Sequence, residues 1–144
     1  MISTTLNTFS FFAKIKNMFA SPIGFFLHTV VSEIVGMLIL LMFLSTVAEL
    51  QVLPMIIPVI IAFNGAAGGY RLGGSEIVAK WRKTALMASA VMLTLFGCVA
   101  SIVFCPWEPL AISRSLVWVL TAVVFTFFGS WIAREYNRLI RKKS

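Results

Sequence analysis

The hydrophobic positions of the chain fall into four long runs that are predominantly apolar on every face. They cover residues 23–44, 52–70, 84–104 and 113–133, and short segments with charged residues, glycine or proline separate them. A helix needs about 20 such residues to cross a bilayer, whereas a barrel strand needs about ten residues of alternating polarity. The pattern predicts an all-α integral membrane protein with four transmembrane helices in an antiparallel bundle, because short loops join antiparallel neighbours.

The flanking segments extend this prediction to the whole chain, which we expect to form one domain over residues 1–144. In residues 1–21, aromatic and aliphatic side chains are interleaved with lysine and asparagine, as in a short amphipathic helix lying in the membrane interface.

Ser21 and Pro22 resemble a helix N-cap and a first helical residue, so the first span should begin there. Pro58 should kink the second span or mark where it becomes regular. A basic tail occupies residues 134–144.

Positive charge is distributed unequally between the two sides of the predicted membrane. Eleven of the twelve Lys and Arg residues lie in the N-terminal segment, the middle loop or the C-terminal tail, and only Arg114 lies on the opposite side. Because positive residues accumulate in short cytoplasmic loops, both termini and the middle loop are predicted to be cytoplasmic. Aromatic residues typical of a membrane boundary fall on the same side, at Tyr70, Trp81, Trp131 and Tyr136. We expect the membrane to be a bacterial inner membrane.

Composition excludes a soluble catalytic domain. Hydrophobic residues make up 60% of the 144 residues, charged residues make up 12%, and the mean hydropathy is +0.97. The net charge of +7 could in principle indicate a nucleic-acid partner, but the basic residues flank the apolar runs. We therefore expect no nucleic acid, and predict contacts with anionic lipid headgroups. The basic residues assigned to these contacts are Arg71, Arg82, Lys83, Arg134, Arg138 and Arg141.

Glu33 is the residue that most needs an explanation, because it lies near the middle of the first run. Insertion scales assign about 2.5–3.5 kcal/mol to Asp, Lys or Arg at a helix centre, and Glu should be of that order. One interpretation is a protonatable group in a transport site. The other, which we favour because no second acidic residue lies in the later runs, is a buried Glu that hydrogen-bonds to a neighbouring helix or a partner subunit.

Polar and small residues at comparable depth complete the candidate site. Asn64 and Thr94 are predicted to lie near the level of Glu33 and to form a polar layer with it. Gly65 and Gly69 form a small-xxx-small pattern, which is typical of a close approach between two membrane helices.

Cysteine and histidine usage argues against metal, cofactor or enzyme chemistry. Cys98 and Cys105 lie seven residues apart on one predicted helix, which separates their Cα atoms by roughly 10 Å and puts them beyond disulfide reach. Two cysteines and one histidine do not make a zinc site. The sequence also has no paired acids or Ser/His arrangement at one depth, so we expect no metal, no cofactor and no enzymatic activity.

A short motif resembles a known family. The segment Ser32-Glu33-Ile34-Val35-Gly36 resembles the first-helix motif of the small multidrug resistance transporters, which are four-helix proteins with a glutamate in that helix. The resemblance implies a dimeric cation–proton antiporter in which Glu33 is the shared proton and substrate site. It covers five residues of 144, the rest of that family's pattern is not recognisable in this chain, and the charge asymmetry argues against the dual-topology members. We assign no family on this motif.

Two functional hypotheses follow from these patterns. The first is a non-enzymatic accessory, interaction or immunity-type subunit that acts through helix packing against a membrane-protein partner or a second copy of itself. The alternative is a small proton-coupled transporter that uses Glu33. The identity of a partner or substrate is not encoded in any pattern of the sequence.

Overall fold

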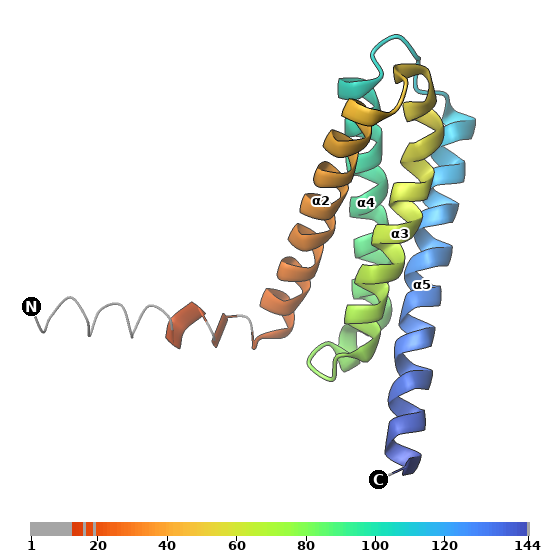
Figure 1. The fold of residues 1–144 in the computed structure, drawn as a ribbon. Helices are drawn as coiled ribbons and strands as arrows, with labels where there is room; N and C mark the ends of the chain where they lie inside the picture. Colours follow the sequence, from red (N-terminus) through yellow and green to blue (C-terminus); the bar gives the residue numbers. More distant parts are fainter. Residues whose placement is uncertain (1–12, 16, 19, 144) are drawn as a thin grey trace, which may run out of the picture.

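A computed structural model of the chain describes residues 13–15, 17–18 and 20–143. Its long helices are α2 (Pro22–Val47), α3 (Leu53–Gly74), α4 (Arg82–Phe104) and α5 (Ile112–Lys143), and the 3₁₀ turns η1 (Leu50–Val52) and η2 (Ala79–Trp81) lie in two of the connections. Each long helix is long and apolar enough to cross a membrane. Figure 1 shows consecutive helices running in alternating directions. The prediction of a helical protein with four segments suited to span a membrane is confirmed for the described residues.

The start of α2 follows from local sequence. The Ser21 hydroxyl accepts a hydrogen bond from the Gly24 amide at 3.0 Å, and Pro22 occupies the first helical position. A proline there costs little because the first amides of a helix have no partner within it. The predicted interfacial helix over residues 1–21 lies mostly outside the described residues, of which 13–15 and 17–18 are helical.

Two helices extend further than the hydrophobic runs suggest. The second run forms one continuous helix that passes through Pro58 and ends at Gly74. The basic tail continues α5 as helix to Lys143, which gives a helix of 32 residues and a length of about 48 Å. The end of α5 consequently projects beyond the loop that joins α3 to α4 (Figure 1). We call this end of the bundle, where α2 begins and α5 ends, the basal end.

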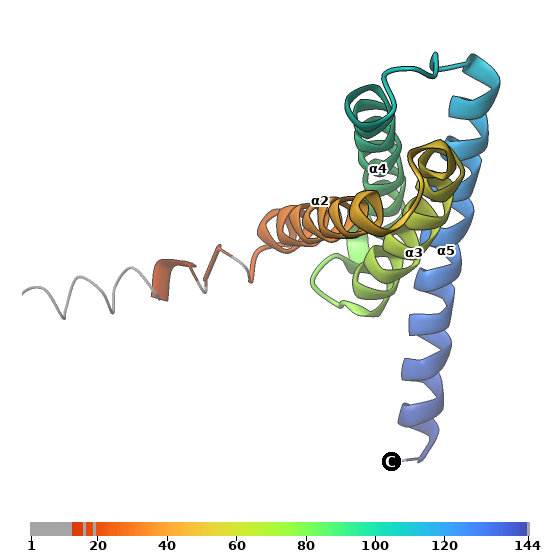
Figure 2. The ribbon, with the colours of Figure 1, turned by 45° about the horizontal axis from the view of Figure 1, so that its top comes forward.

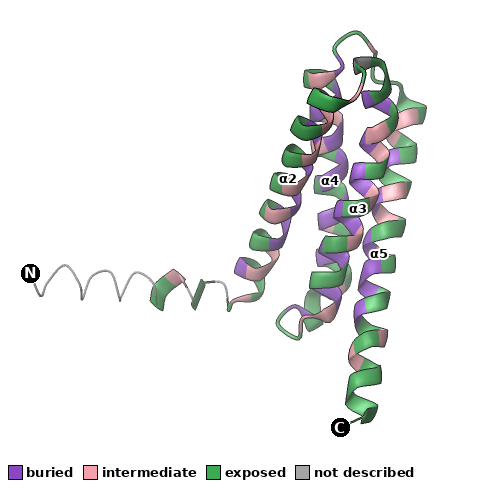
Figure 3. Ribbon diagram, in the orientation of Figure 1, coloured by how far each residue is buried: buried purple, intermediate pink, exposed green. Residues whose placement is uncertain are grey.

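Helix α3 lies at the centre of the bundle and contacts each of the other three long helices. Within its apolar stretch 50% of the residues are buried, against 22% in α2, which lies at the side of the bundle (Figure 2). The buried positions face inward on all four helices and the outer faces are exposed (Figure 3). Away from the basal end, the core is filled by large apolar side chains that include Met37, Leu41, Ile57, Ile61, Leu93 and Trp118.

The most extensive contact joins α3 to α5, which are not neighbours in sequence. Along this contact Gly69 lies against Thr126 and Gly73 lies against Ser130, so the two helices run parallel. A Cβ atom at Gly69 would overlap the backbone carbonyl of Thr126, and a Cβ atom at Gly129 would overlap the carbonyl of Ala66. Helices in a bilayer associate through such close packing, because lipid tails are as apolar as the side chains they would replace.

The contact predicts a steep penalty for bulk at Gly69. Gly69→Leu should lower the free energy of unfolding in detergent by roughly 1–3 kcal/mol or more, the range for overpacking, because the backbone of α5 would have to move. Ala67→Leu, at an exposed position on the same helix, is the matched control and should leave stability nearly unchanged. Equal stability of the two variants would contradict the close α3–α5 contact.

Candidate functional site

Glu33 is held between three helices near the side of the bundle. Its side chain comes from α2 and is buried, with 4% of the residue exposed. The hydroxyl of Ser89, on α4, lies 2.9 Å from both carboxylate oxygens and donates to them. Ser89 is itself fully buried. The carboxylate therefore links α2 to α4 inside the protein.

Gly68 of α3 makes room for this carboxylate. A Cβ atom at Gly68 would overlap Oε1 and Cδ of Glu33, so the acid lies directly against the α3 backbone. Any larger residue at this position would displace the Glu33 side chain from its place beside Ser89. One acid, one glycine and one serine, each from a different helix, thus form a closely fitted contact that we call the Glu33 cluster.

The other two members of the predicted polar layer are buried, but their hydrogen bonds stay within their own helices. Asn64 donates to the Ile60 carbonyl at 2.9 Å, and Thr94 donates to the Ala90 carbonyl at 2.9 Å. The Asn64 side-chain oxygen lies beside Gly36, one turn along from the Glu33 cluster. The structure therefore surrounds Glu33 with Gly68 and Ser89, and Asn64 borders the cluster.

Arg71 approaches the cluster from the basal side. It lies one turn beyond Gly68 on α3, and its guanidinium donates to the hydroxyl of Ser32 at 2.7 Å. Because Ser32 precedes Glu33 on α2, this hydrogen bond places a positive charge beside the cluster. Arg71 was predicted to contact lipid headgroups, and the structure gives this exposed side chain a hydrogen bond to α2 as well.

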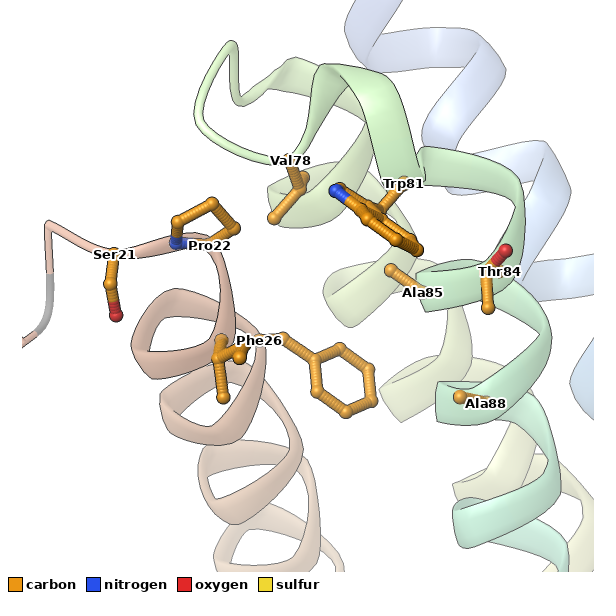
Figure 4. A pocket seen from close by; sticks show the side chains of 9 residues that line it. Ser21, Pro22, Phe26, Val78, Trp81, Thr84, Ala85 and Ala88 are labelled. Atoms are coloured by element: carbon orange, nitrogen blue, oxygen red, sulfur yellow. The ribbon is translucent and has the colours of Figure 1, made fainter.

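Two cavities open at the basal end of the bundle, and neither is lined by the Glu33 cluster. The first has a volume of about 430 Å³ and is almost wholly apolar. Figure 4 shows the ring of Phe26 projecting from α2 toward α4 in this space, with Trp81 on the opposite wall. The second cavity, of about 340 Å³, lies between α5 and the α3–α4 loop and is lined by basic residues.

The predicted headgroup residues divide between these surroundings. Arg82, Arg134, Arg138 and Arg141 all line the second cavity, together with Lys142, which the prediction omitted. Lys83 is exposed on α4 outside it.

Among residues 13–15, 17–18 and 20–143, no group of three His, Cys, Asp or Glu side chains could hold a metal ion, and both cysteines are free.

Comparison with family models, with curated proteins and with solved structures finds no match for this chain. The local resemblance around Glu33 therefore gains no support from the rest of the sequence.

Sequence reasoning missed the two residues that enclose Glu33. Gly68 stands in the same glycine-rich stretch as the predicted packing pair, and an antiparallel pairing of the first two spans could have placed it opposite Glu33. Gly73 continues the four-residue spacing of Gly65 and Gly69, and the spacing alone could have revealed it. Ser89 gave no such signal, because serine and threonine are common in membrane helices.

The contact between Ser89 and Glu33 should be measurable as stability. Ser89→Ala leaves a buried carboxyl without its partner, so the free energy of unfolding in detergent should fall by about 1–3 kcal/mol. Ser101→Ala removes a buried hydroxyl from the same helix three turns away and serves as the control. If the two alanine variants lose the same stability, Ser89 has no special role at Glu33.

Proposed function

We propose that the protein is a non-enzymatic accessory, interaction or immunity-type subunit that acts by packing against a partner within the bilayer. The observation that carries this proposal is the close fit of Glu33 between Gly68 and Ser89. A carboxylate enclosed in this way has a structural use, since it joins three helices. This structural use of the acid supports the packing proposal over a role for Glu33 in chemistry.

The exposed face of α2 is the surface that we assign to the partner. Helix α2 is the least buried of the four spans, so it has the most surface free for a helix of another protein. Between Val31 and Phe43 every exposed position of this face is apolar, which suits a contact within the bilayer. Its exposed side chains include Val31, Val35, Leu38, Ile39, Met42 and Phe43.

Photocrosslinking in the native membrane tests this assignment. A photoreactive amino acid at Ile39, which is 62% exposed on α2, should give one protein adduct of defined mass. The same amino acid at Leu120, which is 64% exposed on α5, is the matched control and should give no protein adduct of that mass. A lack of protein adducts at Ile39, or the same adducts from both positions, would rule out α2 as the partner surface.

We also propose that both termini and the α3–α4 loop are cytoplasmic and that the membrane is a bacterial inner membrane. The support is the eleven-to-one distribution of Lys and Arg, because translocation retains positive residues in short cytoplasmic loops. In this orientation the basal end of the bundle faces the cytoplasm. The basic extension of α5 then projects from the membrane into the headgroup region and beyond it.

A proton-coupled transporter is the second candidate, and one observation favours it. Glu33 is an acid within a membrane span, and Arg71 donates a hydrogen bond to Ser32, the residue before it on α2. Intramembrane carboxylates mark proton pathways in many transporters. Proton flux into liposomes that requires the wild-type protein and is lost in Glu33→Gln would establish this candidate over the first.

A further inference from the structure

The second basal cavity is an open groove bordered by three elements that meet beyond the core. It has a volume of about 340 Å³, within the size range of small-ligand sites, and lies where α3 ends, α4 begins and α5 continues. Gly73 and Gly74, at the end of α3, form part of its wall. The feature is a shaped cavity as well as a charged surface.

The charge of the lining is strongly positive. Five cations, Arg82, Arg134, Arg138, Arg141 and Lys142, line it with a single carboxylate, that of Glu76, so the lining carries a formal charge of 5 − 1 = +4. Glu76 pairs with Arg141 at 3.0 Å, and Arg138 pairs at 3.4 Å with Glu135 just outside the cavity. Within the described residues, Arg134 and Lys142 have no ion pair. The lining therefore has positive charge that is available to bind a compact anion.

Two hydrogen bonds hold the walls of this cavity in place. Asn137 on α5 donates to the Gly74 carbonyl at 3.3 Å, which fixes the extension of α5 against the end of α3. Arg82 donates to the Ser75 carbonyl at 3.2 Å and is thereby held at the edge of the loop.

The spacing of the basic residues matches a single helical face. Arg134, Arg138 and Arg141 recur at intervals of four and three residues along α5, so they project to one side, toward the α3–α4 loop. Exposed Trp131 and Tyr136 lie on either side of Arg134 in the sequence of α5, and such aromatic residues mark the headgroup level of a bilayer. In the orientation proposed above, this places the cavity at the depth of the lipid phosphate groups.

We propose that this cavity binds a phosphate group, supplied either by an anionic phospholipid headgroup or by a soluble phosphate compound. Guanidinium groups match phosphate oxygens in geometry and can bind them through paired hydrogen bonds. The proposal is independent of the partner assigned to α2, because the two surfaces lie on different helices. It also separates Arg82, Arg134, Arg138 and Arg141 from Arg71 and Lys83, which lie outside the cavity.

Native mass spectrometry of the purified full chain in neutral detergent tests the site. The probes are phosphatidylglycerol, zwitterionic phosphatidylcholine and inorganic pyrophosphate, each titrated separately, and pyrophosphate is also added to the complex with phosphatidylglycerol. The wild-type protein should bind phosphatidylglycerol or pyrophosphate in preference to phosphatidylcholine. Arg134→Gln combined with Lys142→Gln should weaken that binding roughly thirtyfold, since two cations near an anionic ligand are lost. Lys14→Gln combined with Lys80→Gln removes two exposed charges outside the cavity and should change it little.

The experiment answers two questions: whether the cavity binds phosphate at all, and whether that phosphate belongs to a lipid or to a soluble compound. Binding of phosphatidylglycerol that pyrophosphate does not displace assigns a lipid headgroup, and binding of pyrophosphate alone assigns a soluble ligand. No preference over phosphatidylcholine together with no pyrophosphate binding would overturn the proposal, as would an equal loss in both double variants. Circular dichroism checks folding, and Lys142→Gln alone, at the exposed end of α5, repeats the comparison if the double variant unfolds.

Discussion

The fold depends on the close approach of helix backbones along α3. Apolar side chains gain little by exchanging lipid contacts for protein contacts, so a membrane bundle is held by tight packing and by hydrogen bonds between helices. Helix α3 supplies close contacts on two faces. Gly69 and Gly73 admit the backbone of α5 on one face, and Gly68 admits the carboxyl of Glu33 on the other. Helix α3 can lie at the centre of the bundle because it has glycine on both of these faces.

The Glu33 cluster has a different role from the α3–α5 contact. Helix α2 is the least buried span, and its contacts with α3 and α4 are correspondingly limited. A buried acid that accepts from Ser89 and fits against Gly68 specifies one register for α2, because a shift along the helix axis would strand the acid in an apolar environment. The cost of burying the acid is thus offset by contacts available in only one arrangement.

The sequence predicts the four helices well because run length and apolarity decide them. It predicts the start of α2 because Ser21 and Pro22 carry a local capping signal. It does not predict that α3 packs most closely on the parallel helix α5, since helices that are apolar on every face have no hydrophobic stripe to indicate their neighbours.

In the candidate site, too, some features can be predicted from the local sequence, whereas others depend on which helices lie side by side. Gly65 and Gly69 indicate a close contact but carry no information about its partner. Glu33 is conspicuous because a charge in a membrane span is costly, whereas Ser89 is recognised only once α2 and α4 are side by side. Likewise the spacing of Arg134, Arg138 and Arg141 suggests one helical face, but the cavity is recognised only once the end of α3 and the start of α4 lie beside that face.

Disulfide trapping between α3 and α5 tests the central contact most directly. A Cβ atom at Gly74 would lie 3.5 Å from the Cβ atom of Ala133, which is within the range of natural disulfides. In a background with Cys98 and Cys105 replaced by alanine, Gly74→Cys with Ala133→Cys should oxidise rapidly in membranes, as measured by mass spectrometry of the linked peptides. Gly74→Cys with Ile132→Cys, one residue away on the exposed side of α5, should not. Equal linkage of both pairs, or none for Gly74 with Ala133, would contradict the parallel packing of α3 on α5.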